Sequence, residues 1–369
     1  MTTRADFGVF ILRGQPITLA HMYIIEHGLA MCDRLIIVLG SSFSAPRWDF
    51  VPFREFIRED MIRSNLTLEQ RKRVIFLHVK DYGNMTLWAD KLSGKVIDAI
   101  GDSDATVALI GHAKDKPTGY YLQQFPDWGS INLPNYGNNL SATPIRDRYI
   151  RDESNYEFEQ YARPFLPEGT LAVLSDFRRT NEFASLLNEK TFMVNYLKDY
   201  YDASEIALAK KENRKPRCSP YPPIFYCADP VVIQGNKVLL VTRGQYPGKG
   251  LLAHAGGHCA GDPAPEAAIR ELYEETEIAL PEAVVRGSII GEKRYDDVNR
   301  STRRQTISVA QFIHLTPQFR DGKVTPPPKV KGSDDAEKAD WYTISELKRE
   351  DMFEDAWLML NDAMALIRK

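Results

Sequence analysis

The first half of the chain alternates short apolar runs with amphipathic segments, and this alternation limits the folds open to it. The apolar runs predict buried strands, and the segments between them repeat apolar residues every three or four positions, as helices do. The expected strands cover 7–12, 34–40, 74–79 and 105–111, and the expected helices cover 21–31, 53–64 and 87–100. This order predicts a doubly wound parallel sheet with helices on both faces. Such a sheet binds ligands at the carboxyl ends of its strands.

The pattern changes about halfway along the 369 residues. A chain of this length is expected to form two or three domains, at about 150 residues per domain. A helical and then basic segment ends in the proline-rich stretch 219–223, which predicts a stiff linker. Two strand-like runs follow and are joined at Gly235-Asn236, which is a hairpin signal. The expected domains are an N-terminal α/β domain over 1–185, a helical connector and linker over 186–220, and a mixed α/β domain over 221–369.

Further elements are expected in the second half. The expected strands there are 224–234, 237–242, 288–292 and 306–314, and the expected helices are 265–276 and 356–367.

The charge and composition of the chain narrow its classes of partner. The formal net charge of −3 argues against general binding to nucleic acid or to an anionic membrane. The start of the chain lacks the pattern of a signal peptide, and no apolar run approaches the ~18 residues that span a bilayer. Four cysteines occur without C-x-x-C pairs, so we expect reduced thiols in the cytoplasm. We interpret the basic run over 210–217 as a solvated helix end rather than a nucleic-acid patch.

The segment that leaves the first expected strand suits a phosphate group. Residues 13–21 read RGQPITLAH and lead into a helix, whose first backbone N–H groups attract anions. His21 is able to donate to phosphate oxygens, Thr18 places a hydroxyl three residues earlier, and Arg13 supplies a permanent charge. Taken alone, the Thr-x-x-His spacing is as well explained by a histidine satisfied within the core.

A second segment, residues 141–146, strengthens the prediction of a phosphate site. Ser141 and Thr143 lie at the start of an expected helix, where hydroxyl side chains suit the cap, and Pro144 suits the first turn. Arg146 lies close enough along that helix to reach the same phosphate. An ordinary capped helix explains this segment equally well in isolation. Both elements together, at opposite ends of a predicted parallel sheet, favour phosphate binding.

These two motifs, T-x-x-H and S-x-T-x-x-R, resemble the signature of the nucleotidylyltransferase superfamily. Arg13, Gln15 and Pro16 resemble the form used by archaeal-type nicotinamide mononucleotide adenylyltransferases. Arg47 resembles a Pro-Arg segment of that family, and Phe50 stands where the family usually has a basic residue. The segments 110–115 and 120–128 resemble the same branch. Within the first of them, the resemblance assigns substrate binding to Gly111, His112, Lys114 and Asp115.

The resemblance implies a reaction in which nicotinamide mononucleotide attacks the α-phosphate of ATP and gives NAD and pyrophosphate. Catalysis would then consist of alignment and charge stabilisation, with Mg²⁺ bridging the triphosphate. The implied catalytic residues are His21, Thr18, Arg13 and Arg146, and the implied binding residues include Gln15, Pro16, Arg47, Ser141 and Thr143. Trp88 and Trp128 are able to stack on a base, but we expect them in the core. A different phosphate acceptor, such as phosphopantetheine or flavin mononucleotide, stays open.

The most specific feature of the chain lies in residues 256–278, where a glycine turn precedes a charged helix. On that helix Glu271, Glu274 and Glu275 fall on one face, at spacings of three and four. Like charges at these spacings repel, and a bound Mg²⁺ or Mn²⁺ removes the repulsion. Arg270 is placed to hold the cluster. A solvated acidic helix is the less favoured alternative, because the glycine turn and the Arg-Glu pair sit at fixed offsets.

This segment resembles the Nudix box, with two departures. Asp262 stands where glutamate is usual, and Glu277 stands where glycine is usual, at a position that often needs an unusual backbone angle. The resemblance implies an α/β/α Nudix domain over 221–369. Its implied metal ligands are Glu271, Glu274 and Glu275, with Glu275 also catalytic, and its implied binding residues include Gly256, Gly257 and Arg270.

Two later segments, 295–308 and 331–341, resemble the ADP-ribose branch of the Nudix family. Arg300 and Arg303 are expected to bind substrate phosphates. Either Glu337 or Asp335 is expected to complete the metal site or to act as the base. The implied reaction is hydrolysis of ADP-ribose to AMP and ribose 5-phosphate by metal-activated water. The alternative is a sensor domain that binds ADP-ribose or NAD without cleaving it.

Over nearly its whole length the chain resembles bacterial bifunctional nicotinamide mononucleotide adenylyltransferase/Nudix hydrolase proteins. The expected small-molecule partners are nicotinamide mononucleotide, ATP, NAD and ADP-ribose, with Mg²⁺ or Mn²⁺ as cofactor. We expect no nucleic-acid or membrane partner, and a homo-oligomer stays open.

Overall fold

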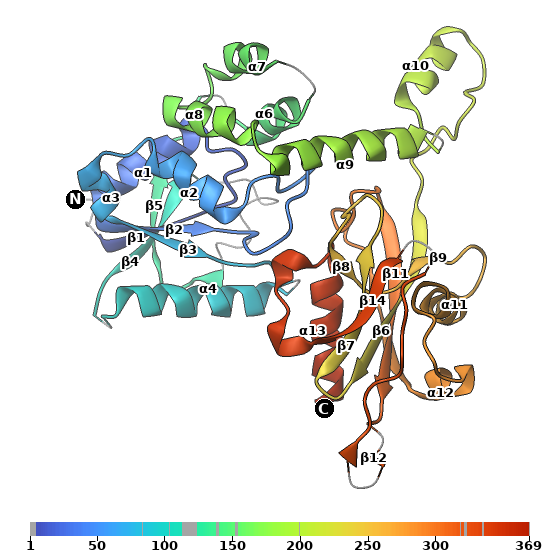
Figure 1. Cartoon of the computed structure of the whole chain (residues 1–369). Helices are drawn as coiled ribbons and strands as arrows, with labels where there is room; N and C mark the ends of the chain where they lie inside the picture. Colours follow the sequence, from blue (N-terminus) through green and yellow to red (C-terminus); the bar gives the residue numbers. More distant parts are fainter. Residues whose placement is uncertain are drawn as a thin grey trace. The chain divides into compact units, whose positions relative to one another are not determined.

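The computed structural model of the chain forms two compact units, Met1–Leu187 and Asn188–Lys369 (Figure 1). It describes residues 5–82, 84–102, 104–112, 124–137, 140–151, 154–198, 200–317, 319–320, 323–333 and 336–368. The segment expected as a connector, 186–220, is grouped almost entirely with the second unit. Within the described ranges, no helix is long and apolar enough to cross a membrane.

A five-stranded parallel sheet forms the centre of the first unit, in the order β3-β2-β1-β4-β5. Its strands are β1 Ala5–Leu12, β2 Cys32–Leu39, β3 Val74–His78, β4 Val107–His112 and β5 Gly129–Leu133. The predicted parallel sheet is therefore confirmed, with β5 as an added edge strand. The strand order reverses between β1 and β4, so their carboxyl ends border the crevice where such sheets bind ligands.

Helices cover both faces of this sheet (Figure 1). The helices of this unit are α1 Leu19–Met31, α2 Glu55–Arg63, α3 Leu68–Lys72, α4 Met85–Ile100, α6 Ala142–Tyr149, α7 Asn155–Ala162 and α8 Glu168–Phe177, and α9 Asn181–Lys198 begins in it and ends in the second unit. Alternate residues of β1 enter different cores. Phe10 packs in the cluster that includes α1 and α2, whereas Val9 packs with α4. Trp88 and Trp128 pack against the α4 cluster, as expected of core residues.

The second unit contains a mixed sheet in the order β10-β11-β6-β7-β14, to which the short strands β8 and β9 add. The strands are β6 Phe225–Gln234, β7 Lys237–Arg243, β8 Leu252–Ala253, β9 Gly257–His258, β10 Ile289–Tyr295, β11 Thr306–Leu315 and β14 Ala336–Thr343. A separate small hairpin pairs β12 Phe319–Arg320 with β13 Lys323–Val324. The predicted hairpin between β6 and β7 is confirmed, and Gly235 at its turn has φ of 60°.

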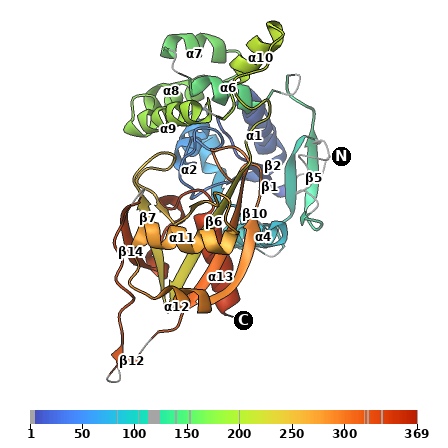
Figure 2. The same cartoon turned by 90° about the vertical axis from the view of Figure 1, so that its right-hand side faces the viewer.

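Two helices sandwich this second sheet, one on each face (Figure 2). The helices of the unit are α10 Ala203–Lys211, α11 Ala264–Thr276, α12 Glu282–Gly287 and α13 Ala356–Ile367. Leu272 of α11 packs on one face with Leu239, and Leu360 of α13 packs on the other with Leu240. This arrangement confirms the expected α/β/α architecture and places the acidic helix α11 directly against the sheet.

Candidate active sites

The first site lies where β1 ends and α1 begins, and its centre is the pair Thr18 and His21. Thr18 is fully buried at the N-cap of α1. Its backbone N–H donates to His21 Nδ1 at 3.0 Å, and its hydroxyl lies 3.0 Å from the same nitrogen. An amide N–H only donates, so Nδ1 is the acceptor and the neutral ring carries its proton on Nε2. The hydrogen bond from Thr18 therefore leaves Nε2 as the donor nitrogen of His21.

The loop before Thr18 is tied down by Gln15, whose side chain is buried. Its amide donates to the carbonyl of Phe53 at 3.0 Å and accepts from the Phe53 N–H at 3.1 Å. Both polar atoms of Gln15 are thus used within the protein, which gives it a positioning role at this site. Pro16, which follows it, is buried as well.

A buried arginine that the sequence analysis did not select holds the ends of two strands together. Arg58 of α2 is fully buried. Its guanidinium donates to the carbonyl of Arg13 at 2.7 Å and to the carbonyl of Gly40 at 2.8 Å. Burial lowers the pKa of Arg58 to about 10, so the group stays protonated at neutral pH. The sequence feature that could have identified Arg58 is its position on the apolar face of α2, beside Ile57 and Met61.

Three predicted cationic residues meet around Phe50. The guanidinium carbon of Arg13 lies 4.5 Å from the centre of the Phe50 ring, and that of Arg47 lies 6.0 Å from it. Arg146 Nη1 donates to the Phe50 carbonyl at 3.2 Å. Asp49 pairs with Arg47, and Asp147 pairs with Arg146, each at 3.0 Å. Segments far apart in the sequence therefore bring their positive charges to one turn.

Other predicted residues of this site lie at the start of α6 and at the end of β4. Ser141 is the N-cap of α6, and its hydroxyl accepts from the backbone N–H of Thr143 at 3.3 Å. Gly111 lies near the end of β4, and a Cβ there would meet nothing within 4 Å. His112 ends β4, while Lys114 and Asp115 lie outside the described residues.

The second site is built around the acidic helix α11 and the glycine turn before it. Arg270 Nη1 donates to Glu271 at 2.8 Å and to Glu274 at 3.0 Å. Its Nε donates to Asp262 at 3.3 Å, so the shorter acidic side chain still reaches the arginine. Glu277 ends the helix with φ of 42°, the unusual backbone angle that its position predicted. Both departures from the Nudix box are therefore accommodated.

Glu275 is the most perturbed carboxyl group of this site. It is buried, and its Oε2 accepts from the Gly256 N–H at 3.1 Å. Burial raises the pKa of Glu275 to about 8; the Gly256 hydrogen bond opposes this shift, and the nearby Glu271 reinforces it. A carboxyl group that is costly to ionise in this setting would gain from a bound cation.

The glycine turn lets carboxylates approach the backbone closely. A Cβ on Gly257 would lie 2.7 Å from the oxygens of Glu271, and one on Gly256 would collide with Asp229. In the described part of the chain, however, no three acidic, histidine or cysteine side chains converge as a ready metal site. Arg270 holds Glu271 and Glu274 together, whereas Glu275 is directed to the Gly256 N–H. The oxygen donors and the tight glycine turn fit a hard divalent cation.

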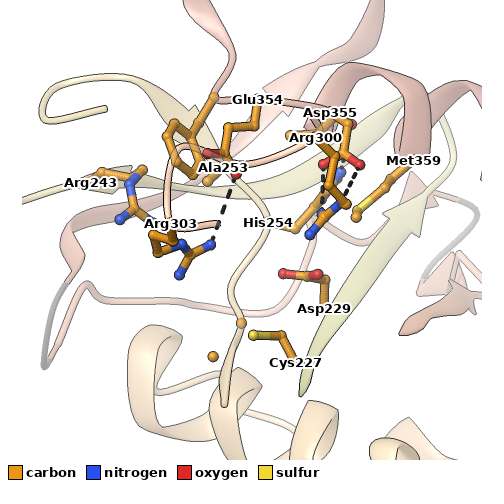
Figure 3. Close-up of a pocket in the computed structure, with 14 residues that line it drawn as sticks. Cys227, Asp229, Arg243, Ala253, His254, Arg300, Arg303, Glu354, Asp355 and Met359 are labelled. Carbon is orange, nitrogen blue, oxygen red and sulfur yellow. Dashed lines mark hydrogen bonds and ion pairs between the residues drawn. The ribbon is translucent and has the colours of Figure 1, made fainter. Parts of the chain in front are cut away.

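A pocket opens beside this glycine turn, and Figure 3 shows Asp229, His254, Arg300, Arg303 and Asp355 around it. Both predicted phosphate-binding arginines line this pocket. Arg300 forms two hydrogen bonds to Asp355, at 2.7 and 2.8 Å. Arg303 Nη2 lies 3.9 Å from Glu354. Burial raises the pKa of Asp355, and Arg300 opposes that shift.

His254 is a pocket residue that the sequence analysis did not select, because a histidine within an apolar run gives no distinct signal. Its ring is buried, and Nε2 lies 3.0 Å from the Ala356 carbonyl, which only accepts. Nε2 therefore carries the proton, and burial lowers the pKa of the ring. The remaining acceptor, Nδ1, has no hydrogen-bond partner within the described ranges. Of the other two predicted residues, Glu337 lies exposed on β14, and Asp335 is outside those ranges.

Comparisons with known proteins find relatives for each half of the chain. The NUDIX domain family matches residues 228–362. A nicotinamide/nicotinic acid mononucleotide adenylyltransferase of Acinetobacter baylyi is 34% identical over 181 residues, which are 49% of this chain and 91% of that protein. An ADP-ribose pyrophosphatase of Methanocaldococcus jannaschii is 26% identical over 164 residues, which are 44% of this chain and 85% of that protein.

Two of the solved structures resemble nearly the whole chain. The first is a bifunctional NMN adenylyltransferase/ADP ribose pyrophosphatase from Francisella tularensis, with 28% identity, a TM-score of 0.78, and coverage of 98% of this chain and 99% of that one. The same kind of protein complexed with AMP and a manganese ion gives 27% identity, a TM-score of 0.79 and the same coverage. The predicted relationship is confirmed: the chain belongs to the nicotinamide mononucleotide adenylyltransferase family in its N-terminal half and has a NUDIX domain in its C-terminal half.

Proposed function

We propose that the first unit transfers AMP from ATP to nicotinamide mononucleotide, giving NAD and pyrophosphate. The meeting of Arg13, Arg47 and Arg146 at one turn is the observation that supports this most directly. A cluster of guanidinium groups suits a triphosphate, because arginine binds phosphate oxygens in a fixed fork geometry. The cluster includes Arg13, which leaves β1 at the edge of the sheet where ligands bind.

The proposed transfer needs no protein nucleophile. A phosphate oxygen of nicotinamide mononucleotide attacks the α-phosphorus of ATP, and the bond to the bridging oxygen of the departing pyrophosphate breaks. ATP enters as its Mg²⁺ complex. The His21 Nε2–H and the arginine cluster stabilise the charge that develops on the phosphate oxygens, and Thr18 holds the ring of His21 in its tautomer. The N-terminus of α6, capped by Ser141, supplies further backbone donors.

We propose that the second unit hydrolyses ADP-ribose to AMP and ribose 5-phosphate. A bound Mg²⁺ or Mn²⁺, held by Glu271, Glu274 and Glu275, would supply an activated water molecule and neutralise phosphate charge. Arg303 and Arg300 bind the substrate phosphates in the neighbouring pocket, with Arg300 kept in place by Asp355. His254 offers Nδ1 as an acceptor for a hydroxyl group of the substrate.

The geometry of the Nudix box favours catalysis over a sensor role. The sensor alternative depended on the changes at Asp262 and Glu277. Asp262 keeps its hydrogen bond to Arg270, and Glu277 adopts the left-handed angle without disturbing the helix end. Glu271 and Glu275 are buried on α11 with both changes present.

The test is to incubate the intact protein with Mg²⁺, ATP and nicotinamide mononucleotide, and separately with ADP-ribose, and to identify the products. We expect NAD from the first mixture, lost in His21→Ala, and AMP with ribose 5-phosphate from the second, lost in Glu275→Gln. Each variant serves as the control for the other reaction. NAD formation that is unchanged in His21→Ala would contradict the first proposal. Tight binding of ADP-ribose without turnover would contradict the second proposal. Transfer of AMP to another phosphate acceptor, with no NAD formed, would contradict the choice of nicotinamide mononucleotide in the first.

A further inference from the structure

Phe50, an apolar residue, contacts all three arginines of the cluster formed by Arg13, Arg47 and Arg146. Phe50 lies in a tight turn, in which the N–H of Arg47 donates to the Val51 carbonyl at 3.0 Å. The ring faces Arg13 and Arg47, and the backbone carbonyl accepts from Arg146. One residue thus contacts all three cations through two different parts of its structure.

Arg13 depends on the ring more than the other two arginines do. Arg47 pairs with Asp49 and Arg146 pairs with Asp147, each at 3.0 Å. Across the described residues, no carboxylate forms an ion pair with Arg13, whose side chain is exposed. The Phe50 ring, whose centre is 4.5 Å from the guanidinium carbon, contacts it. A guanidinium over an aromatic face is attracted by the negative potential of the ring.

This arrangement also limits the repulsion between like charges. Three guanidinium groups gathered at one turn repel each other, and each carboxylate that neutralised them would compete with an incoming phosphate. An aromatic face attracts a cation without adding negative charge to the site. Arg13 is therefore held in place while its full positive charge stays available to a polyphosphate.

We propose that Phe50 is a positioning residue of the adenylyltransferase site, where its ring holds Arg13 for the triphosphate of ATP. The inference rests on the proposed function of the first unit. Replacement by an aliphatic side chain releases Arg13 but leaves the backbone contact with Arg146. Replacement by another aromatic side chain keeps the ring face and with it the position of Arg13.

The experiment compares Phe50→Leu with Phe50→Tyr. The matched control is Phe56→Leu, which makes the same change at an exposed phenylalanine of α2. Two readouts are used: kcat/KM for ATP in NAD formation, and the affinity for inorganic triphosphate by calorimetry. We expect Phe50→Leu to lose roughly threefold to thirtyfold in both, the range of a cation–π contact. Phe50→Tyr should recover most of the loss, and Phe56→Leu should match the unaltered protein.

A double-mutant cycle with Arg13→Ala separates positioning from packing. If the ring acts through Arg13, Phe50→Leu has much less effect on triphosphate affinity once Arg13 is absent. Equal effects in both backgrounds, or a Phe50→Leu variant that binds triphosphate normally, would overturn the proposal. If the unaltered protein binds triphosphate with this coupling but forms no NAD, the proposed function fails and the role of Phe50 stands. If it binds no triphosphate, both fail.

Discussion

At the scale of single residues, the second site depends on a carboxyl group held where ionisation is unfavourable. Glu275 is buried beside Gly256, and Glu271 lies close enough to raise its pKa further. The glycines of the turn matter for the same reason, because a side chain at Gly257 would occupy the space of the Glu271 oxygens. The protein therefore carries at this site a cost in folding free energy, which a metal ion would relieve.

This cost predicts a pH dependence of stability in the presence of a chelator. The pKa of Glu275 is about 8 in the folded protein, against a reference value of 4.5. Between these two values the folded state binds more protons than the unfolded state. The contribution of Glu275 to the free energy of unfolding therefore falls as the pH rises from 4.5 through 8. We expect Glu275→Gln to be more stable than the unaltered protein at pH 9, by about 2–4 kcal/mol, and similar at pH 4.

Denaturant unfolding of the second unit in EDTA would measure this difference. Glu274→Gln is the matched control, since its carboxylate is partly exposed and pairs with Arg270. It should not reproduce the gain at high pH. If the difference in unfolding free energy between Glu275→Gln and the unaltered protein is the same at pH 4 and pH 9, the carboxyl group has an ordinary pKa.

At the scale of elements, the sequence predicted those with strong apolar periodicity. The strands β1 to β4 and the helices α1, α2, α4, α11 and α13 lie within a few residues of their expected bounds. The edge strand β5 was missed because most of its residues are exposed and form no apolar run. The strand β14 was missed for a similar reason, since charged residues interrupt it.

The candidate sites divide in the same way between local and distant contacts. The pair Thr18 and His21 and the cluster on α11 were predicted because spacing along one helix determines them. Phe50 and Arg58 were not, because their partners come from distant segments and depend on the packing of α2 and the turn before it. No local pattern marks a phenylalanine whose ring attracts two arginines.

Arg58 leads to a prediction about how α2 supports the first site. Replacing it with methionine removes the donors to two strand-end carbonyls, and a buried group left without its partner costs about 1–3 kcal/mol. We expect Arg58→Met to lower the stability of the first unit by about 3 kcal/mol or more. NAD formation should fall as well, because the backbone of Arg13 loses its anchor.

Thermal unfolding and kcat/KM for ATP would measure these two effects. Arg58→Lys keeps a charge and some donors, so partial recovery of both is expected. The control is Arg63→Met on the same helix. This partly exposed arginine pairs with Glu59 and lies over the Phe76 ring, so we expect its replacement to cost less stability than that of Arg58. An Arg58→Met variant as stable as the Arg63→Met control would contradict the anchoring role.

At the scale of the whole molecule, the second unit begins within α9, well before the proline-rich linker. Residues of that helix pack onto the Nudix unit. The rings of Phe192 and Tyr246 have centroids 6.1 Å apart, and so do those of Tyr196 and Phe225. Met193 of the same helix is fully buried. The helix thus contributes ring contacts to the second unit.

A pair of truncated chains would test this contribution. A piece that covers 188–369 keeps the aromatic contacts, whereas a piece that begins at residue 221 loses Phe192, Met193 and Tyr196 together. Since losing one large buried side chain costs about 2–5 kcal/mol, we expect the shorter piece to unfold at a clearly lower urea concentration or to remain unfolded. Within the longer piece, Phe192→Ala should be destabilising, while Val194→Ala, at an exposed position, should have little effect. Equal urea midpoints for the two pieces would mean that α9 only lies against the Nudix unit, and that its rings add no stability to it.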